Sequence, residues 1–182
     1  RGRSLSEKGS LPPSRGLKPL EALERLLSYA VREKELPEVS SSLMKKFKGL
    51  RGVLDASHEE LKSSGSLDER GAIFLKLAKE AAGVYLKERM MGSDAVKNKK
   101  SVLDYLNLTL SGARIEKLLA ISLNSKNEAL SMDILHEGTI NQTVVYPRKA
   151  IERAFRHKAG GEIFVHNHPS GELEPSEPDL AV

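Results

Sequence analysis

Two histidines separated by a single residue lie near the carboxyl end of the chain. His166 and His168 come at the end of the short apolar segment Glu162–Val165, which is predicted to be a strand. Alternate residues of a strand leave the same face, so both imidazoles can converge on one metal ion. Imidazole nitrogen is a common zinc ligand. The spacing predicts a zinc site, although a lone His-x-His is more often surface decoration or a hydrogen-bonded core pair.

A carboxylate that fits such a site follows in the sequence. Residues 169–178 are rich in Pro and Gly and can turn the chain back, which brings Asp179 towards the histidines. Two imidazoles and one carboxylate leave the fourth tetrahedral position to water, as in catalytic zinc sites. Ser176 and Asp179 also have the spacing of a helix capping box. Both interpretations stay open and are compatible, because a helix start would hold Asp179 in place.

Composition limits the chemistry and divides the chain. There is no Cys among the 182 residues, which excludes a thiolate zinc site, a disulfide framework and a cysteine nucleophile. Lys and Arg outnumber Asp and Glu by 21 to 14 in residues 1–100, whereas the ratio is 8 to 11 in residues 101–182. Four of the five histidines lie in the second half. This segregation predicts two modules.

The first half has the periodicity of helices. Residues 1–18 are rich in Gly, Ser, Pro and basic groups and predict a flexible arm. Apolar residues at three- and four-residue spacing predict helices over 19–34 and 39–48, a third helix after Ser57, and a long fourth helix that reaches about residue 90. We therefore expect an all-α domain over 19–92 and a linker over 93–100.

The second half changes its period. A short helix is predicted from Ser101, and a further helix is predicted from Pro147 to about Gly160. Strands are predicted at 117–124, 129–135, 143–146 and 162–165. This order predicts an α/β domain over 101–182.

The chain also lacks the features of an exported or membrane protein. No apolar run approaches the roughly 18–20 residues that cross a bilayer. The segment that begins at Arg1 has no apolar stretch of the kind found in signal peptides. We expect a cytoplasmic protein with no membrane partner.

The pattern around the histidines resembles a known family. His166, His168, Ser176 and Asp179, with seven and two residues between the last three, match the signature of the JAMM (MPN+, JAB) metalloproteases. Residues 137–143, the Tyr-Pro-Arg run at 146–148 and the His-Asn-His-Pro-Ser-Gly run resemble the bacterial RadC family. The resemblance covers about residues 17–182. It implies an α+β JAMM domain, similar to cytidine deaminases in fold, after a small helix-hairpin-helix region.

The resemblance also implies an activity and roles for individual residues. Members of the wider family are zinc-dependent hydrolases that cut peptide or isopeptide bonds. By this likeness His166, His168 and Asp179 are the zinc ligands, and Ser176 steadies the oxyanion of the reaction. A general-base glutamate stands at the start of the first strand in the family, where this chain has Glu116. The alternative candidates for this base are Glu137 and Glu128.

A second function stays open beside hydrolysis. The family is associated with DNA repair, so the protein is alternatively a DNA-associated accessory protein in which the JAMM fold is a scaffold. Where the family has Gly-x-Gly in its hairpin, this chain has Gly65-Ser66-Leu67, which weakens the expected phosphate site. The basic side chains of Lys45, Lys46, Lys48 and Arg51 favour weak, non-specific DNA binding instead.

Two further expectations concern the carboxyl end of the chain and the set of ligand residues. Family members continue beyond the metal-binding aspartate, whereas this chain stops at Val182, so we expect the second domain to be incomplete. A catalytically silent interaction domain is disfavoured because the ligand residues are all present. The sequence indicates neither the physiological substrate nor an oligomeric state.

Overall fold

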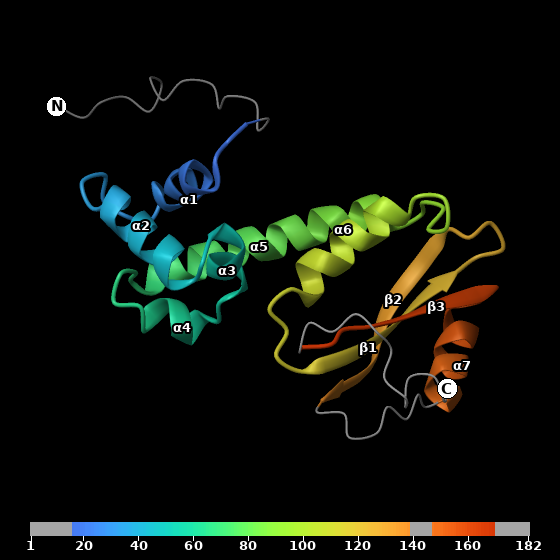
Figure 1. The fold of residues 1–182 in the computed structure, drawn as a ribbon. Coiled ribbons are helices and arrows are strands. Elements are labelled where there is room, and N and C mark those ends of the chain that lie inside the picture. The colour runs from blue at the N-terminus through green and yellow to red at the C-terminus, as the bar shows by residue number, and fades with distance from the viewer. Residues whose placement is uncertain (1–15, 139–146, 170–182) are drawn as a thin grey trace. The chain divides into compact units, whose positions relative to one another are not determined.

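The computed structural model describes residues 16–138 and 147–169, which form seven helices and three strands (Figure 1). The contacts divide the chain into two units, residues 1–76 and 77–182, and the division falls within the long helix α5 (Glu69–Met90). Within the described ranges, no helix is both long and apolar enough to cross a bilayer.

The first unit is helical, as the sequence predicted. It contains α1 (Pro19–Leu27), α2 (Leu36–Lys46), α3 (Leu50–Asp55), α4 (His58–Lys62) and the beginning of α5. Aliphatic side chains from all five helices form its core, and several of them are fully buried: Leu23, Leu27, Leu43, Val53, Leu61 and Leu75. Burial of these side chains is the main source of stability, because helices this short are marginal in isolation.

Local hydrogen bonds fix the start of α4 and its distance from α5. Ser57 accepts a bond from the amide of Glu60 at 3.2 Å, and the Glu60 carboxylate accepts one from the amide of Ser57 at 2.8 Å, so the predicted cap is a capping box. Lys62 at the end of α4 pairs with Glu69 of α5 at 2.5 Å. The hydrogen bond from Lys62 lowers the pKa of the Glu69 carboxyl, which keeps this pair charged at neutral pH.

The second unit is built on an antiparallel sheet. Its strands are β1 (Glu116–Leu123), β2 (Ala129–Gly138) and β3 (Gly161–His166), in the spatial order β2-β1-β3 (Figure 1). Leu118 of β1 is opposite His136 on β2 and opposite His166 on β3. The second unit therefore combines helices and strands, as expected, and its strands form a small antiparallel sheet.

Helices cover both faces of this sheet because β1 is apolar on both sides. Ile121 and Leu123 pack with side chains of α6 (Lys99–Leu110) and of the end of α5. Leu118 and Ala120 alternate with them along the strand and pack with Ala150 of α7 (Pro147–His157). A strand buried on both faces reads as a continuous apolar run, which is what Leu118–Ile121 shows, and the buried Ser122 that follows donates to the Glu162 carboxylate at 3.2 Å.

The boundaries of several elements differ from the prediction. α1 ends at Leu27 instead of residue 34, where the Ser28 hydroxyl donates to the carbonyl of Arg25 at 2.8 Å. The predicted linker 93–100 has ordered contacts at both ends. Its first residues pack on the β1–β2 turn, since Ala95 donates to the carbonyl of Asn127 at 2.8 Å and Asp94 forms a bridge with Glu128, and α6 begins at Lys99.

Truncation of Ile121 is expected to destabilise the second unit. Its side chain is fully buried between the sheet and α6, so Ile121→Ala leaves a cavity and lowers the free energy of unfolding by about 2–5 kcal/mol. Urea denaturation followed by circular dichroism measures the change. Ile151 of α7 is 55% exposed, so Ile151→Ala is the matched control and should change stability by less than about 0.5 kcal/mol. Equal effects of the two variants would contradict this core.

Candidate metal centre

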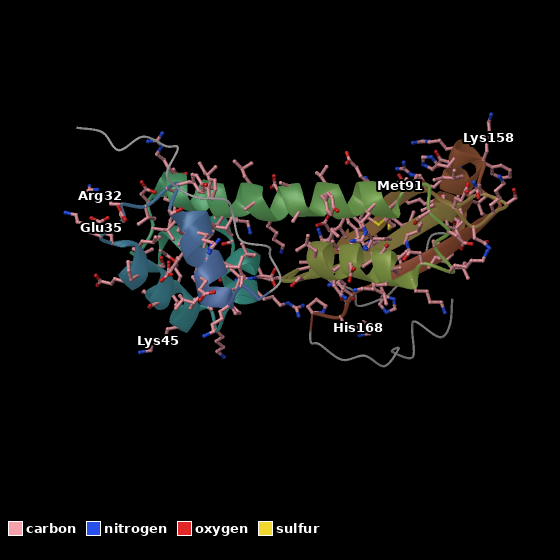
Figure 2. The ribbon with its side chains drawn as sticks, turned by 90° about the horizontal axis from the view of Figure 1, so that it is seen from above. Arg32, Glu35, Lys45, Met91, Lys158 and His168 are labelled. Carbon is pink, nitrogen blue, oxygen red and sulfur yellow. The ribbon has the colours of Figure 1, made fainter. Side chains whose placement is uncertain are left out.

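The two predicted ligand histidines meet at the end of β3. His166 is the last residue of the strand, and Figure 2 shows His168 just beyond it. Their Nε2 atoms are 2.6 Å apart, and their ring centroids are separated by 4.7 Å. A hydrogen bond joins these two atoms, and the tautomers of the rings decide which Nε2 donates. The two Nε2 atoms face each other, and the roles of both histidines as zinc ligands stay a prediction.

Glu116 lies on the same face of the sheet as His166. In the β1–β3 ladder Leu118 is opposite His166, and directly opposed residues share a face. Glu116 is two residues before Leu118 on β1, so its side chain leaves that face as well. The β1–β3 ladder ends at the Leu118–His166 pair, and Glu116 begins β1 two residues before that pair. The carboxylate predicted as the general base thus lies at the end of the sheet that carries the histidine pair, and its role as base stays a prediction.

The two other candidates for the general base, Glu137 and Glu128, lie elsewhere on the sheet and have other partners. Glu137 is opposite Lys117 on the other face of the sheet and pairs with its Nζ at 2.7 Å. Glu128 belongs to the β1–β2 turn, where its carboxylate accepts from the Asn124 amide at 2.7 Å. That turn is at the opposite end of β1, roughly 15 Å from Leu118 at the usual rise per residue. Neither carboxylate shares the location of Glu116.

The residue between the two histidines contacts the start of β1. The Asn167 carboxamide accepts a hydrogen bond from the amide of Lys117 at 2.9 Å and donates one to the carbonyl of Ile115 at 3.2 Å. Sequence reasoning did not single out Asn167. The signal that was available is a carboxamide placed where a strand ends, since such a side chain can replace backbone groups in the ladder.

The two imidazole Nε2 atoms are of a ligand type that zinc accepts, and a small opening of the pair would make room for the ion. Two nitrogens bound to one tetrahedral zinc lie roughly 3.3 Å apart, so the observed 2.6 Å requires the rings to open by roughly 0.7 Å. Within residues 16–138 and 147–169 no group of three or more His, Asp or Glu side chains gathers in a metal-binding arrangement. The predicted third ligand Asp179 lies outside the described residues, as do Ser176 and the predicted strand 143–146.

Comparisons with known proteins give the family. The family model described as RadC-like JAB domain matches residues 96–182. A UPF0758 protein of Nitrosospira multiformis is 33% identical over 162 residues, which cover 89% of this chain and 72% of that protein. The chain belongs to the RadC family. Two further UPF0758 relatives agree: that of Dechloromonas aromatica is 36% identical over 87% of this chain and 71% of its own length, and that of Pseudoalteromonas translucida is 32% identical over 98% and 78%.

Membership of the RadC family agrees with the fold. The matched residues 96–182 include α6, the three strands, α7 and the histidine pair. The JAB description therefore applies to the second unit, whose antiparallel sheet carries His166 and His168 at one end. The first unit is helical, and the RadC relatives extend over it as well.

Proposed function

We propose that this RadC-family chain is a zinc-dependent hydrolase that cuts amide bonds in peptides or in isopeptide-linked proteins. The observation that carries the proposal is the convergence of the His166 and His168 Nε2 atoms on the face of the sheet that also carries Glu116. An imidazole pair and a carboxylate on one face of a sheet are side chains that metal-assisted hydrolysis uses.

Each residue has a defined task in this proposal. His166 and His168 bind the ion through Nε2, and Asp179 completes the protein ligands. When bound, zinc supplies a Lewis acid that polarises the amide carbonyl and makes water acidic near neutral pH. Glu116 accepts the proton of the attacking water and later donates it to the leaving nitrogen. The Ser176 hydroxyl donates a hydrogen bond to the carbonyl oxygen as negative charge develops there.

A peptide library tests this proposal. The wild-type chain is incubated with linear and isopeptide-linked peptides in the presence of Zn²⁺, and the products are identified by mass spectrometry. We expect cleavage that a chelator abolishes and that added Zn²⁺ restores. A chain that is loaded with zinc and cuts neither class of peptide would exclude amide hydrolysis as its function.

A second proposal, non-specific DNA binding, concerns the first unit. Lys45, Lys46 and Lys48 are exposed at the end of α2, and Figure 2 shows Lys45 at the surface of this unit. The hairpin does not offer a phosphate site of the Gly-x-Gly kind. The amide of Ser66 already donates to Ser64 Oγ at 3.2 Å, and Leu67 is buried in the core, only 8% exposed. The side-chain cations are therefore the proposed contacts.

Charge reversal separates this second function from the first. The triple variant Lys45→Glu, Lys46→Glu, Lys48→Glu should weaken binding to duplex DNA by at least about tenfold at low salt, because phosphate contacts are electrostatic. The matched control reverses Lys97, Lys99 and Lys100 in the second unit and makes the same change in net charge. Fluorescence anisotropy at several salt concentrations measures both. An equal loss of DNA affinity in the two variants would show that binding depends on the net charge of the chain and not on these three lysines.

A further inference from the structure

Asn167 joins the histidine pair to the backbone of β1. Its Oδ1 accepts from the amide of Lys117 at 2.9 Å, and its Nδ2 donates to the carbonyl of Ile115 at 3.2 Å. An amide N–H can only donate and a carbonyl can only accept, so these two partners fix the orientation of the carboxamide. We propose that Asn167 is a positioning residue that holds Glu116 beside His166 and His168.

The two hydrogen bonds bracket Glu116. Along a strand, the backbone groups of alternate residues point to the same side, so the Ile115 carbonyl and the Lys117 amide both face the β3 side of β1. The last backbone pair of this ladder is Leu118 with His166. Beyond that pair the Asn167 side chain supplies the partners, and the peptide groups before and after Glu116 are both fixed by one carboxamide.

The location explains why such a fixation matters. Glu116 is the first residue of β1 and is paired with Gly138 on its β2 side, so the β3 side is the one on which this strand end depends on Asn167 against fraying. Asn167 comes from the same three-residue segment as the two histidines, so any movement of that segment moves the backbone of Glu116 with it. A base that is misplaced by about 1 Å can lose on the order of a hundredfold in rate. The carboxamide thus ties the backbone on both sides of Glu116 to the segment that carries the two histidines.

This inference rests on the proposed hydrolysis, in which Glu116 is the general base, but its structural part can be measured without activity. Loss of the carboxamide in Asn167→Ala removes the acceptor for the Lys117 amide. We expect hydrogen exchange of that amide to accelerate at least tenfold, as followed by NMR. Zinc content should stay within about twofold of the wild type, because His166 and His168 are unchanged.

Kinetics then test the positioning role. Asn167→Ala should lower kcat for peptide hydrolysis by about 10- to 100-fold and leave KM within about threefold, since substrate contacts are not touched. In a Glu116→Gln background the same substitution should lower the residual rate less than about threefold. A residue that acts through Glu116 has little left to contribute once that carboxylate is gone.

Asn124→Ala is the matched control. Asn124 also binds backbone amides with its carboxamide oxygen, those of Lys126 at 2.8 Å and Glu128 at 3.0 Å, but at the far end of β1. The Asn124→Ala variant should leave kcat and the hydrogen-exchange rate of the Lys117 amide unchanged.

Three results would overturn the inference. The first is an Asn167→Ala variant in which the Lys117 amide exchanges at the wild-type rate, and the second is a variant in which exchange is faster but kcat is unchanged. The third is a fold-loss in kcat that is as large in the Glu116→Gln background as in the wild type. A wild type without hydrolysis would overturn the proposed function and the kinetic consequence together. In that case Lys117 exchange alone decides whether Asn167 holds this part of β1.

Discussion

Glu116→Gln is expected to abolish hydrolysis and leave zinc binding intact. The amide is close in size to the carboxylate but cannot accept the proton of the attacking water, so kcat should fall by about 10²- to 10⁴-fold. Glu116 lies on the same face of the sheet as His166, two residues before the Leu118–His166 pair along β1, and is not one of the proposed ligands. Steady-state kinetics and metal analysis of the same preparation measure the two properties together.

Two other carboxylates provide matched controls for this variant. Glu137 pairs with Lys117 on the opposite face, and Glu128 pairs with Asn124 in the β1–β2 turn. Glu137→Gln and Glu128→Gln should keep kcat within about threefold of the wild type, because neither carboxylate lies on the face of the sheet that carries Glu116 and His166 at that end of β1. Loss of zinc in Glu116→Gln would mean that Glu116 is a ligand and that the base has been misassigned.

The second large effect is the loss of zinc-dependent stability in His166→Ala. A ligand that binds only the folded state stabilises it by about 2.7 kcal/mol when its concentration is a hundred times the Kd. We expect Zn²⁺ to raise the Tm of the wild type and to leave the Tm of His166→Ala unchanged. His168→Ala should behave in the same way, because the two Nε2 atoms face each other at 2.6 Å. Differential scanning calorimetry measures the shift.

His136 is the control for an unspecific histidine effect. It is opposite Leu118 on β2, as His166 is on β3, so the two histidines are in one row of the sheet but roughly 10 Å apart. His136→Ala should keep the full zinc-dependent rise in Tm. A rise that is lost in His136→Ala and kept in His166→Ala would place the metal elsewhere on this sheet.

Elements with a clear period were predictable from the sequence, whereas short or irregular ones were not. The long helix α5 and the apolar strand β1 were expected close to their observed bounds. β1 buries a regular pattern of side chains, whereas α5 buries Ala72, Leu75 and Met90 and leaves Leu77 and Tyr85 of its predicted apolar pattern exposed. Helix α3 was missed because six residues give too little periodicity. It follows Lys48 and Gly49, both with positive φ, which form a turn that apolar spacing does not reveal.

The sequence predicted that His166 and His168 lie side by side, but not the geometry around them. The one-residue spacing of His166 and His168 was enough to place both rings on one face. The position of Glu116 depends on the pairing register of two strands that are far apart in the sequence, and only the resemblance to a family indicated it. The role of Asn167 depends on the same register, because its partners Ile115 and Lys117 are some fifty residues away.

X-ray absorption spectroscopy at the zinc edge tests the central claim most directly. The wild-type chain is loaded with Zn²⁺, freed of excess metal by dialysis and measured together with His166→Ala. We predict a four-coordinate shell with two imidazole nitrogens at about 2.0–2.1 Å and oxygen ligands in the remaining positions. The imidazole signature should be lost or halved in the variant. A wild type that retains no zinc, or whose zinc has no imidazole ligand, would contradict the account.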